Sequence, residues 1–408
     1  MSRHCDREAG SSAASLRHCM VVYSYYPLGE TRVQREAEAL VEAGFEVDLI
    51  CPRQTGERRR ESYHGVTVHR LPMEIRKASL LDQLLGYLLF LAVSGAQLTR
   101  LHLRRRYHSI QVHNLPDFLV FCALVPKLMG VPVVLDLHDL MPEFFAGRFE
   151  NGPRWLRHLI RLQERVACGF GDLVITVSDH WRDVLVERGV APDKILVVMN
   201  VADERIFRIP DPPPTRGEGF SLIYHGTVTH RYGLDLAVSA VALLRQEIPG
   251  LRLTILGKGD QMEELCSLTK QLGVGDMVEL RNELVPAECL PDIIARADLG
   301  IVPYRSDVFT DGLLPTKLME YAVMGLPCVA AATTAIDAYF RDTMIAFFTP
   351  GDARSLADTI LELHRDPDRR WRLAEQARVF TSRHNWQEIG AEYVAEVTKL
   401  ARKAVQPV

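Results

Sequence analysis

The strongest constraint on the fold is a strand–helix alternation that runs through the chain twice. The first run begins with an apolar strand at 20–26, continues as a helical pattern at 32–43, and returns to a strand at 46–51. A strand, a helix and a strand in this order form a βαβ unit, and its repetition predicts a doubly wound parallel α/β sheet. The first run ends with a strand at 195–199.

A proline-rich break separates the two runs. Residues 211–219 contain three prolines and two glycines, which excludes a helix or a central strand. The alternation then restarts with a strand at 221–224 and ends in helices at 355–364 and 369–382. We therefore predict two α/β domains, residues 19–204 and 205–385, after a disordered tail at 1–18.

Composition excludes several classes of protein. The net charge is −4, so the chain lacks the basic footprint of a general nucleic-acid binder, and we expect no nucleic-acid partner. The eight cysteines include no C-x-x-C pair, which argues against structural zinc and favours reduced thiols in a cytoplasmic protein. Residues 1–18 lack the apolar run of a secretory signal.

One apolar segment raises the question of a membrane. Seventeen uncharged residues lie between Asp82 and Arg100, with basic residues on both sides, from 76 to 106. The run is shorter than the roughly 20 apolar residues of a spanning helix and contains several polar residues, which disfavours spanning. Two other interpretations stay open, a buried helix and an interfacial helix on an anionic lipid surface.

Loops after the strands hold the candidate site residues, because parallel sheets bind ligands beyond the carboxyl ends of their strands. In the first half, a glycine loop follows the first strand, where backbone amides could approach a phosphate or sugar oxygen, although a tight turn explains it equally. The strand at 133–137 ends in a polar cluster in which His138 could bind a substrate hydroxyl, although helix capping is the alternative. The candidates for substrate binding in this half are Gly29, Glu30, Thr31, His113, Asp139 and Glu143.

The second half offers a glycine turn and an arginine after its first strand. Gly226 and Thr227 follow that strand, and Arg231 supplies a forked donor for phosphate oxygens unless it is merely a solvated loop residue. Gly257 lies in a second turn, for which tight strand–helix packing is the simpler account. The dinucleotide pattern G-x-G-x-x-G fails there at Met262, which disfavours an NAD-dependent dehydrogenase.

The most informative segment is 311–327. A loop with glycine and proline opens a helix, whose N-terminus carries positive partial charge. Lys317 lies in the first turn, where a cation is unfavourable unless an anion binds, and Glu320 follows one turn later. A simple Lys–Glu helix pair is the alternative. The loop contributes further candidates for substrate binding: Asp311, Gly312, Leu313, Leu314, Pro315 and Thr316.

Together these motifs resemble the retaining glycosyltransferases of family 4, the group 1 glycosyl transferases, which have the GT-B fold. The resemblance rests mainly on Pro315-x-Lys317-x-x-Glu320, supported by residues 225–235 and 138–143. It implies two Rossmann-like domains facing each other across a cleft. The first would bind the acceptor, the second the nucleotide-sugar donor, and a C-terminal helix at 386–408 would pack back on the first.

The resemblance also implies an activity, which is transfer of a hexose from a nucleotide-diphosphate sugar to a hydroxyl of a sugar or lipid-linked sugar acceptor. The anomeric configuration would be retained, with no metal and no cofactor, in polysaccharide or glycoconjugate synthesis. The enzyme would be cytoplasmic or lie at the inner face of the membrane, with peripheral contact through residues 76–106. Catalytic roles are expected for His138, Arg231, Lys317 and Glu320.

Departures from the family pattern shape these assignments. Glu320 matches the glutamate that holds the ribose, but Gly312 stands where the family has a second glutamate, so backbone amides of 312–316 are expected to contact the sugar. Thr227 and Tyr232 stand where arginine and lysine are common, so Arg231 and Lys317 are the expected pyrophosphate ligands. The alternative functions are a non-catalytic GT-B nucleotide-binding or assembly protein and a nucleotide-sugar epimerase or phosphorylase.

Overall fold

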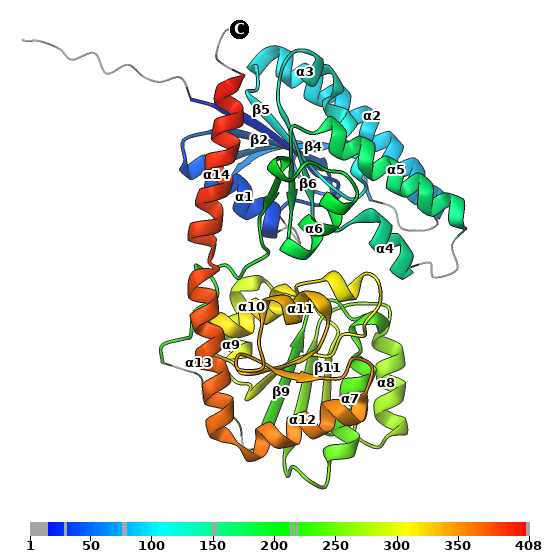
Figure 1. The fold of residues 1–408 in the computed structure, drawn as a ribbon, viewed down its shortest axis with the longest axis vertical. Helices are drawn as coiled ribbons and strands as arrows, with labels where there is room; N and C mark the ends of the chain where they lie inside the picture. Colours follow the sequence, from blue (N-terminus) through cyan, green and yellow to red (C-terminus); the bar gives the residue numbers. More distant parts are fainter. Residues whose placement is uncertain are drawn as a thin grey trace, which may run out of the picture. The chain divides into compact units, whose positions relative to one another are not determined.

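The computed structural model describes residues 15–27, 31–75, 80–148, 153–212, 214, 217 and 219–404. These residues form two sheets interleaved with helices (Figure 1). The chain divides into two compact units. Unit 1 contains the described residues up to Asp136, Ala167–Val174 and those from Tyr393 onward, and unit 2 contains Leu137–Val166 and Ile175–Glu392.

The first sheet has eight strands in the order β3-β4-β2-β1-β5-β6-β7-β8. Its inner strands β5 and β6 are buried along their whole length, as expected for strands covered on both faces. Strand β3 is antiparallel to β4, whereas the pairs from β4 through to β6 are parallel. The strands are β1 Arg17–Val21, β2 Glu46–Pro52, β3 Arg60–Tyr63, β4 Val66–Leu71, β5 Ser109–His113, β6 Val133–Leu137, β7 Leu173–Thr176 and β8 Ile195–Val197.

The second sheet has six strands in the order β11-β10-β9-β12-β13-β14, with parallel pairing throughout. The chain moves outward from β9 to β11 and then returns to β12 on the other side of β9. The strand order therefore reverses between β9 and β12. The strands are β9 Phe220–His225, β10 Leu251–Leu256, β11 Val278–Arg281, β12 Leu299–Val302, β13 Cys328–Ala331 and β14 Ala346–Phe348.

Helices connect the strands of both sheets, as the alternation in the sequence predicts. Those associated with the first sheet are α1 Thr31–Glu42, α2 Leu80–Arg105, η1 Asp117–Ala123, α3 Leu124–Leu128, α4 Met141–Arg148, α5 Arg154–Phe170, α6 Asp179–Glu187 and η2 Pro192–Lys194. Those that follow are η3 His230–Tyr232, α7 Leu234–Leu244, α8 Met262–Gln271, η4 Ala287–Cys289, α9 Leu290–Ile294, η5 Thr310–Gly312, α10 Thr316–Val323, α11 Thr334–Tyr339, α12 Ala353–Arg365, α13 Pro367–Arg383 and α14 Trp386–Lys403.

The first strand begins earlier than the sequence pattern indicates. Arg17 and His18 belong to β1, so they are part of the sheet and not of the tail expected at 1–18. His18 is fully buried, and its Nδ1 lies 2.7 Å from the Ser109 hydroxyl, which explains how a polar residue enters the sheet. Residues 1–14 lie outside the described residues.

Helix α2 corrects the interpretation of the apolar segment as a buried helix. Its buried residues form one narrow stripe, made of Phe90, Ser94, Leu98 and His102 at intervals of four residues. Its other leucines are exposed, among them Leu81 at 65% and Leu89 at 54%. By length and composition alone the helix is long and apolar enough to cross a membrane. Only 17% of its most apolar stretch is buried, unlike the core helix of a globular domain. Apolar sequence is the same in a core helix and in an exposed one, so the pattern alone could not separate them.

Candidate active site

The second sheet offers a candidate ligand site at the point where its strand order reverses. Parallel sheets bind ligands outside the carboxyl ends of the strands at such a point. Strand β9 ends at His225, and Gly226 and Thr227 form the turn after it. Helix α10 follows β12 along the chain. Tyr321 of α10 donates from its hydroxyl to the Ile223 carbonyl at 3.2 Å, which fixes the helix against β9. The motif singled out in the sequence therefore lies beside the first glycine turn.

Lys317 is buried at the start of α10 among tyrosines. Its Nζ donates to the Tyr304 hydroxyl at 2.8 Å. It also lies 4.9 Å from the ring centroid of Tyr224, 5.1 Å from that of Tyr304 and 5.4 Å from that of Tyr232. Burial lowers the pKa of Lys317 below its ordinary value, because the aromatic surroundings solvate the ammonium poorly. This arrangement holds a cation whose desolvation an anion would offset.

Glu320 lies one turn further along α10 and faces the end of β9. Its carboxylate is 3.2 Å from Nε2 of His225. Burial, followed by the positive charge of Lys317, lowers the pKa of His225 to about 3, so the ring is neutral at pH 7 and the contact is not an ion pair. The neutral His225 ring therefore brings no positive charge to the Glu320 carboxylate in this contact. Lys317 and Glu320 are three residues apart on one helix. A ligand with an anionic group next to a diol could therefore bind the lysine through the anion and the carboxylate through the diol.

Two glycines at the site are required by close backbone packing. A Cβ at Gly257 would lie 1.8 Å from the Gly226 carbonyl oxygen, so the turns after β9 and β10 touch each other. Gly226 has φ +120°, and a Cβ there would come within 3.3 Å of Cε of Lys317. Gly259 is similarly pressed against the Val228 carbonyl. Tight packing accounts for the turn at Gly257, as the simpler interpretation predicts, while Gly226 leaves the space that Lys317 uses.

The loop before α10 is braced by its own side chains. The Asp311 carboxylate accepts hydrogen bonds from the hydroxyls of Ser306 and Thr334 and from the Thr334 amide. Asp311 therefore acts in this structure as a loop support. No side chain caps the N-terminus of α10, where Pro315 precedes Thr316, so its first amides are available to a ligand. Gly312 is buried, and Leu313 and Leu314 carry the chain from η5 toward the helix.

Arg231 lies in η3, directly after the glycine turn. Its guanidinium is 4.9 Å from the Phe309 ring centroid. A residue that the sequence analysis missed holds this segment, because Arg305 binds Asp235 at 2.8 Å and the His230 carbonyl at 2.8 Å. Thr227 is exposed, and its carbonyl accepts a hydrogen bond from Tyr224. Tyr304 was also missed, although its position two residues beyond β12 could have marked it as a residue at a strand end.

Candidates in unit 1 divide between buried and exposed positions. His113 is fully buried, with Nδ1 3.0 Å from Asp136, so as placed it has no exposed surface for a substrate. Asp136 also binds Arg32 at 3.0 Å. Thr31 is exposed at the start of α1, whereas Gly29 and Glu30 lie outside the described residues.

The segment after β6 holds the remaining candidates, all in unit 2. His138 and Asp139 are half-buried at its start. Glu143 is buried and pairs with Arg188, which also binds Glu164 at 3.0 Å. Burial raises the pKa of Glu164, although Arg188 opposes the shift. Glu143 thus ties α4 to the residue that follows α6, and the sequence could not reveal this partner because Arg188 is 45 positions away.

Two family models match the chain in tandem. The glycosyl transferase 4-like domain matches residues 29–200, and the glycosyl transferases group 1 domain matches residues 207–380. The chain belongs to the group 1 glycosyltransferases. The family assignment made from Pro315, Lys317 and Glu320 is therefore confirmed.

Similar proteins include several named glycosyltransferases. A putative colanic acid biosynthesis glycosyltransferase, WcaL, from Escherichia coli is 28% identical over 193 residues, which cover 47% of each chain. A D-inositol 3-phosphate glycosyltransferase from Thermomonospora curvata is 26% identical over 271 residues, which cover 61% of each chain. The chain therefore spans about half the length of the curated relatives it matches first, at 47% and 48%.

Solved structures share the fold of this protein over nearly the whole chain. Sucrose-phosphate synthase from Thermosynechococcus elongatus superposes with a TM-score of 0.77 at 16% identity, covering 94% of this chain and 99% of that one. Anabaena HepE in complex with UDP-glucose gives a TM-score of 0.69 at 16% identity, covering 94% and 100%. These likenesses confirm the predicted GT-B fold of two Rossmann-like α/β domains.

Proposed function

We propose that the protein transfers a sugar from a nucleotide-diphosphate sugar to an acceptor hydroxyl with retention of anomeric configuration, in polysaccharide or glycoconjugate synthesis. The observation that carries this proposal is the buried Lys317 at the uncapped start of α10, beside the turn at Gly226. A cation without an ion-pair partner among the described residues, desolvated at a helix N-terminus, supports binding of a diphosphate.

The difficult step is departure of the nucleoside diphosphate, because negative charge grows on the leaving oxygen. Lys317 and the first amides of α10 would meet this charge, and Arg231 would join them. Preorganised donors of this kind contribute about 10²–10³ in rate each. These fixed charges supply the stabilisation without a metal ion. Glu320 would accept hydrogen bonds from the ribose hydroxyls, and His138 would bond to the donor sugar or orient the acceptor.

A donor panel combined with a product assay tests this function. Binding of a ligand to the folded state raises its apparent stability, so thermal shifts across UDP-, GDP- and dTDP-sugars identify the donor. Transfer requires that nucleoside diphosphate be released faster when the acceptor is present, with a new glycosidic product. Donor binding without product under any acceptor would instead support the non-catalytic alternative.

We also propose that helix α2 rests on an anionic membrane surface. Its exposed side carries Leu81, Leu84, Leu85, Leu88 and Leu89, and it ends in the exposed Arg100 and Arg104. Exposed apolar residues followed by arginines match the apolar and anionic layers of a lipid surface. Helix α5, taken by itself, has a similar exposed stripe of Trp155, Leu159, Leu162 and Val166 between arginines. The protein would thus be a peripheral enzyme at the inner face of the membrane, where a lipid-linked acceptor is found.

Vesicle sedimentation tests this contact. The protein is mixed with vesicles of phosphatidylcholine and phosphatidylglycerol, and Leu85→Gln/Leu89→Gln is expected to lower the bound fraction at least tenfold, because each buried leucine contributes about 1.5–3 kcal/mol. The control, Leu243→Gln/Leu284→Gln, changes two leucines that are also exposed, at 44% and 72%, but lie outside α2. Equal binding by both variants would refute the contact through α2.

A further inference from the structure

A basic pocket lies at the carboxyl end of β4, in unit 1. It has a volume of about 300 Å³, and six of the residues lining it offer hydrogen-bond donors: Arg59, Arg60, His69, Arg70, Gln97 and Arg100. The first four come from β3, β4 and the turn before them, and the last two from α2. The carboxyl end of a parallel strand is where α/β sheets bind ligands, so the position suits a binding site.

Arg70 forms the buried floor of this pocket. Its side chain is only 2% exposed, and it is held by Glu57 at 3.1 Å, by Glu61 and by the Tyr26 carbonyl at 3.0 Å. These partners lie around Nε and Nη2, whereas Nη1 has no acceptor among the described residues. A buried guanidinium nitrogen without an acceptor is costly, and an anionic oxygen in the pocket would satisfy it.

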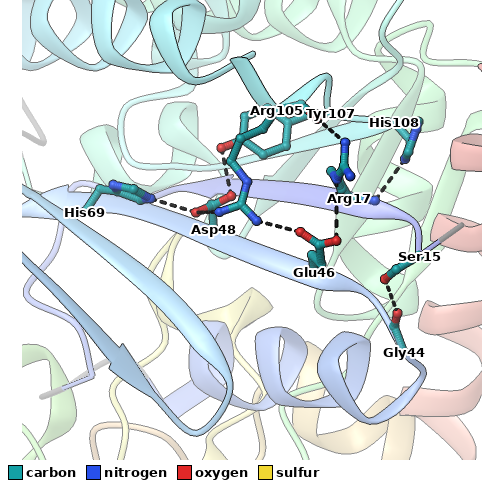
Figure 2. A network of polar contacts seen from close by, with 9 residues as sticks. All are labelled: Ser15, Arg17, Gly44, Glu46, Asp48, His69, Arg105, Tyr107 and His108. Atoms are coloured by element: carbon teal, nitrogen blue, oxygen red, sulfur yellow. Dashed lines mark hydrogen bonds and ion pairs between the residues drawn. The ribbon is translucent and has the colours of Figure 1, made fainter. Parts of the chain in front are cut away.

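A polar network holds the walls of the pocket in place (Figure 2). Asp48 of β2 is fully buried and accepts from Nε2 of His69 at 2.7 Å, from Arg105 at 3.1 Å and from the Tyr107 hydroxyl at 2.9 Å. Arg105 also binds Glu46 at 2.6 Å. His69 lines the pocket and Arg105 ends α2, so one carboxylate fixes both the strand side and the helix side. The pocket is therefore preorganised, as an anion site requires.

The charge of the pocket is positive. Arg70 is balanced by two carboxylates, but Arg59, Arg60 and Arg100 have no ion-pair partner within the described part of the chain. Gln97 and Arg100 are three residues apart on α2, so both reach the pocket from one face of that helix. The same helix carries its exposed leucines in the preceding turns.

We propose that this pocket binds the phosphate or diphosphate group of the acceptor. The proposal rests on the function proposed above, because it assigns the acceptor a negatively charged group in addition to its reacting hydroxyl. Forked guanidinium donors suit phosphate oxygens, and a diphosphate monoester would meet Arg70 below and Arg60 and Arg100 at the rim. Two sources carry this chemistry, a lipid-linked diphosphate and a soluble sugar phosphate.

Calorimetric titration of the full chain with inorganic pyrophosphate tests the pocket. UDP is kept at saturation so that the donor site does not contribute. The variant Arg60→Gln/Arg100→Gln removes two rim donors and leaves the buried Arg70 network intact. We expect its affinity for pyrophosphate to fall about 100-fold, or about tenfold for each guanidinium removed. The control is Arg58→Gln/Arg104→Gln, which removes the same charge from exposed positions on the same segments that do not line the pocket.

The outcomes distinguish binding in the pocket from diffuse electrostatic attraction. Equal weakening by both double variants would show diffuse attraction and overturn the proposal, as would failure of the wild type to bind pyrophosphate in the presence of UDP. UDP affinity, measured separately, should be the same in both variants. If pyrophosphate binds as predicted but no nucleotide does, the proposed function fails while the pocket stands.

A second arm distinguishes the two sources. Wild-type protein is sedimented with phosphatidylcholine vesicles with and without geranylgeranyl diphosphate. Binding that rises with the lipid diphosphate, that Arg60→Gln/Arg100→Gln abolishes and that Arg58→Gln/Arg104→Gln retains identifies a lipid-borne group, because the second variant removes the same charge from α2 and the segment before β3. Pyrophosphate binding without this gain identifies a soluble phosphate. Vesicle binding that is gained equally by the pocket variant and the wild type would overturn the assignment.

Discussion

Replacing Lys317 with methionine should separate stability from function. Methionine has nearly the same shape but no charge, so the change removes a cation that is buried among Tyr224, Tyr232 and Tyr304. The side chain's hydrogen bond to the Tyr304 hydroxyl is removed as well. A buried charge without a close partner costs free energy, and replacing it with an apolar group of the same size is often neutral or stabilising.

We expect a small change in stability and a large loss of transfer activity. Loss of the hydrogen bond to Tyr304 costs about 0.5–1.5 kcal/mol, and recovery of the desolvation penalty offsets it, so the unfolding free energy should change by no more than about 1 kcal/mol. Transfer should fall about 10²–10³-fold, because one preorganised donor to the leaving diphosphate is missing. Burial lowers the pKa of Lys317, so the unfolded chain binds this proton more tightly. The wild type therefore gains stability relative to Lys317→Met as pH rises toward 10.5, the ordinary lysine value.

Chemical denaturation at several pH values and steady-state transfer assays measure the two effects on the same preparations. The thermal shift produced by the donor gives an independent measure of binding. If Lys317→Met is several kcal/mol less stable than the wild type but binds the donor equally well, Lys317 stabilises the fold and does not bind the diphosphate.

Three further changes test other parts of the site. Glu320→Gln should weaken UDP binding roughly tenfold or more while leaving the weaker binding of 2′,3′-dideoxy-UDP unchanged, because the carboxylate is proposed to bind the ribose hydroxyls; an equal loss for both ligands would contradict that role. Gly257→Ala should lower the unfolding free energy by about 2–4 kcal/mol, since its Cβ would lie 1.8 Å from a carbonyl oxygen, whereas Gly275→Ala, which meets nothing within 4 Å, should change it by less than about 0.5 kcal/mol in the same denaturation experiment. Burial and Lys317 lower the pKa of His225 from 6.5 to about 3, so the unfolded state binds more protons between these values, and the wild type should lose stability relative to His225→Asn by up to about 1.4 kcal/mol per pH unit as pH falls through this range; parallel stability curves for the two proteins would show that His225 is not the cause.

The sequence was sufficient for the architecture, and it pointed to α10 as the centre of the candidate site. Strand–helix alternation predicts parallel sheets because each crossover needs a helix, and Lys317 with Glu320 could be recognised because both lie on one short helix. The cage around Lys317 could not be predicted, since Tyr304 reaches it from 13 positions away and only the tertiary fold brings its hydroxyl to the ammonium. The same limit applies to Arg188 and Glu143, whose pairing joins two helices.

The anion pocket shows a different limit. Arg59, Arg60 and Arg70 look like surface charge in a polar stretch, and the pattern gives no hint that Arg70 is buried. Its burial follows from strand pairing, because β4 lies between β2 and β3, and the guanidinium binds Glu61 of β3, Glu57 before that strand and the Tyr26 carbonyl. Long-range pairing of this kind depends on register, which residue types alone do not fix.

The last helix has a consequence for how the protein is made. Tyr393 of α14 is fully buried, and its hydroxyl donates to the side-chain oxygen of Gln111 at 2.8 Å across 282 positions of sequence. The amide nitrogen of Gln111 donates to Glu36. Both polar atoms of this side chain therefore have partners only once α14 has packed against the first sheet. During synthesis the first sheet can assemble, but it cannot close its interior before residue 393 has left the ribosome. Removal of the final helix by proteolysis would reopen the half of the molecule that is translated first.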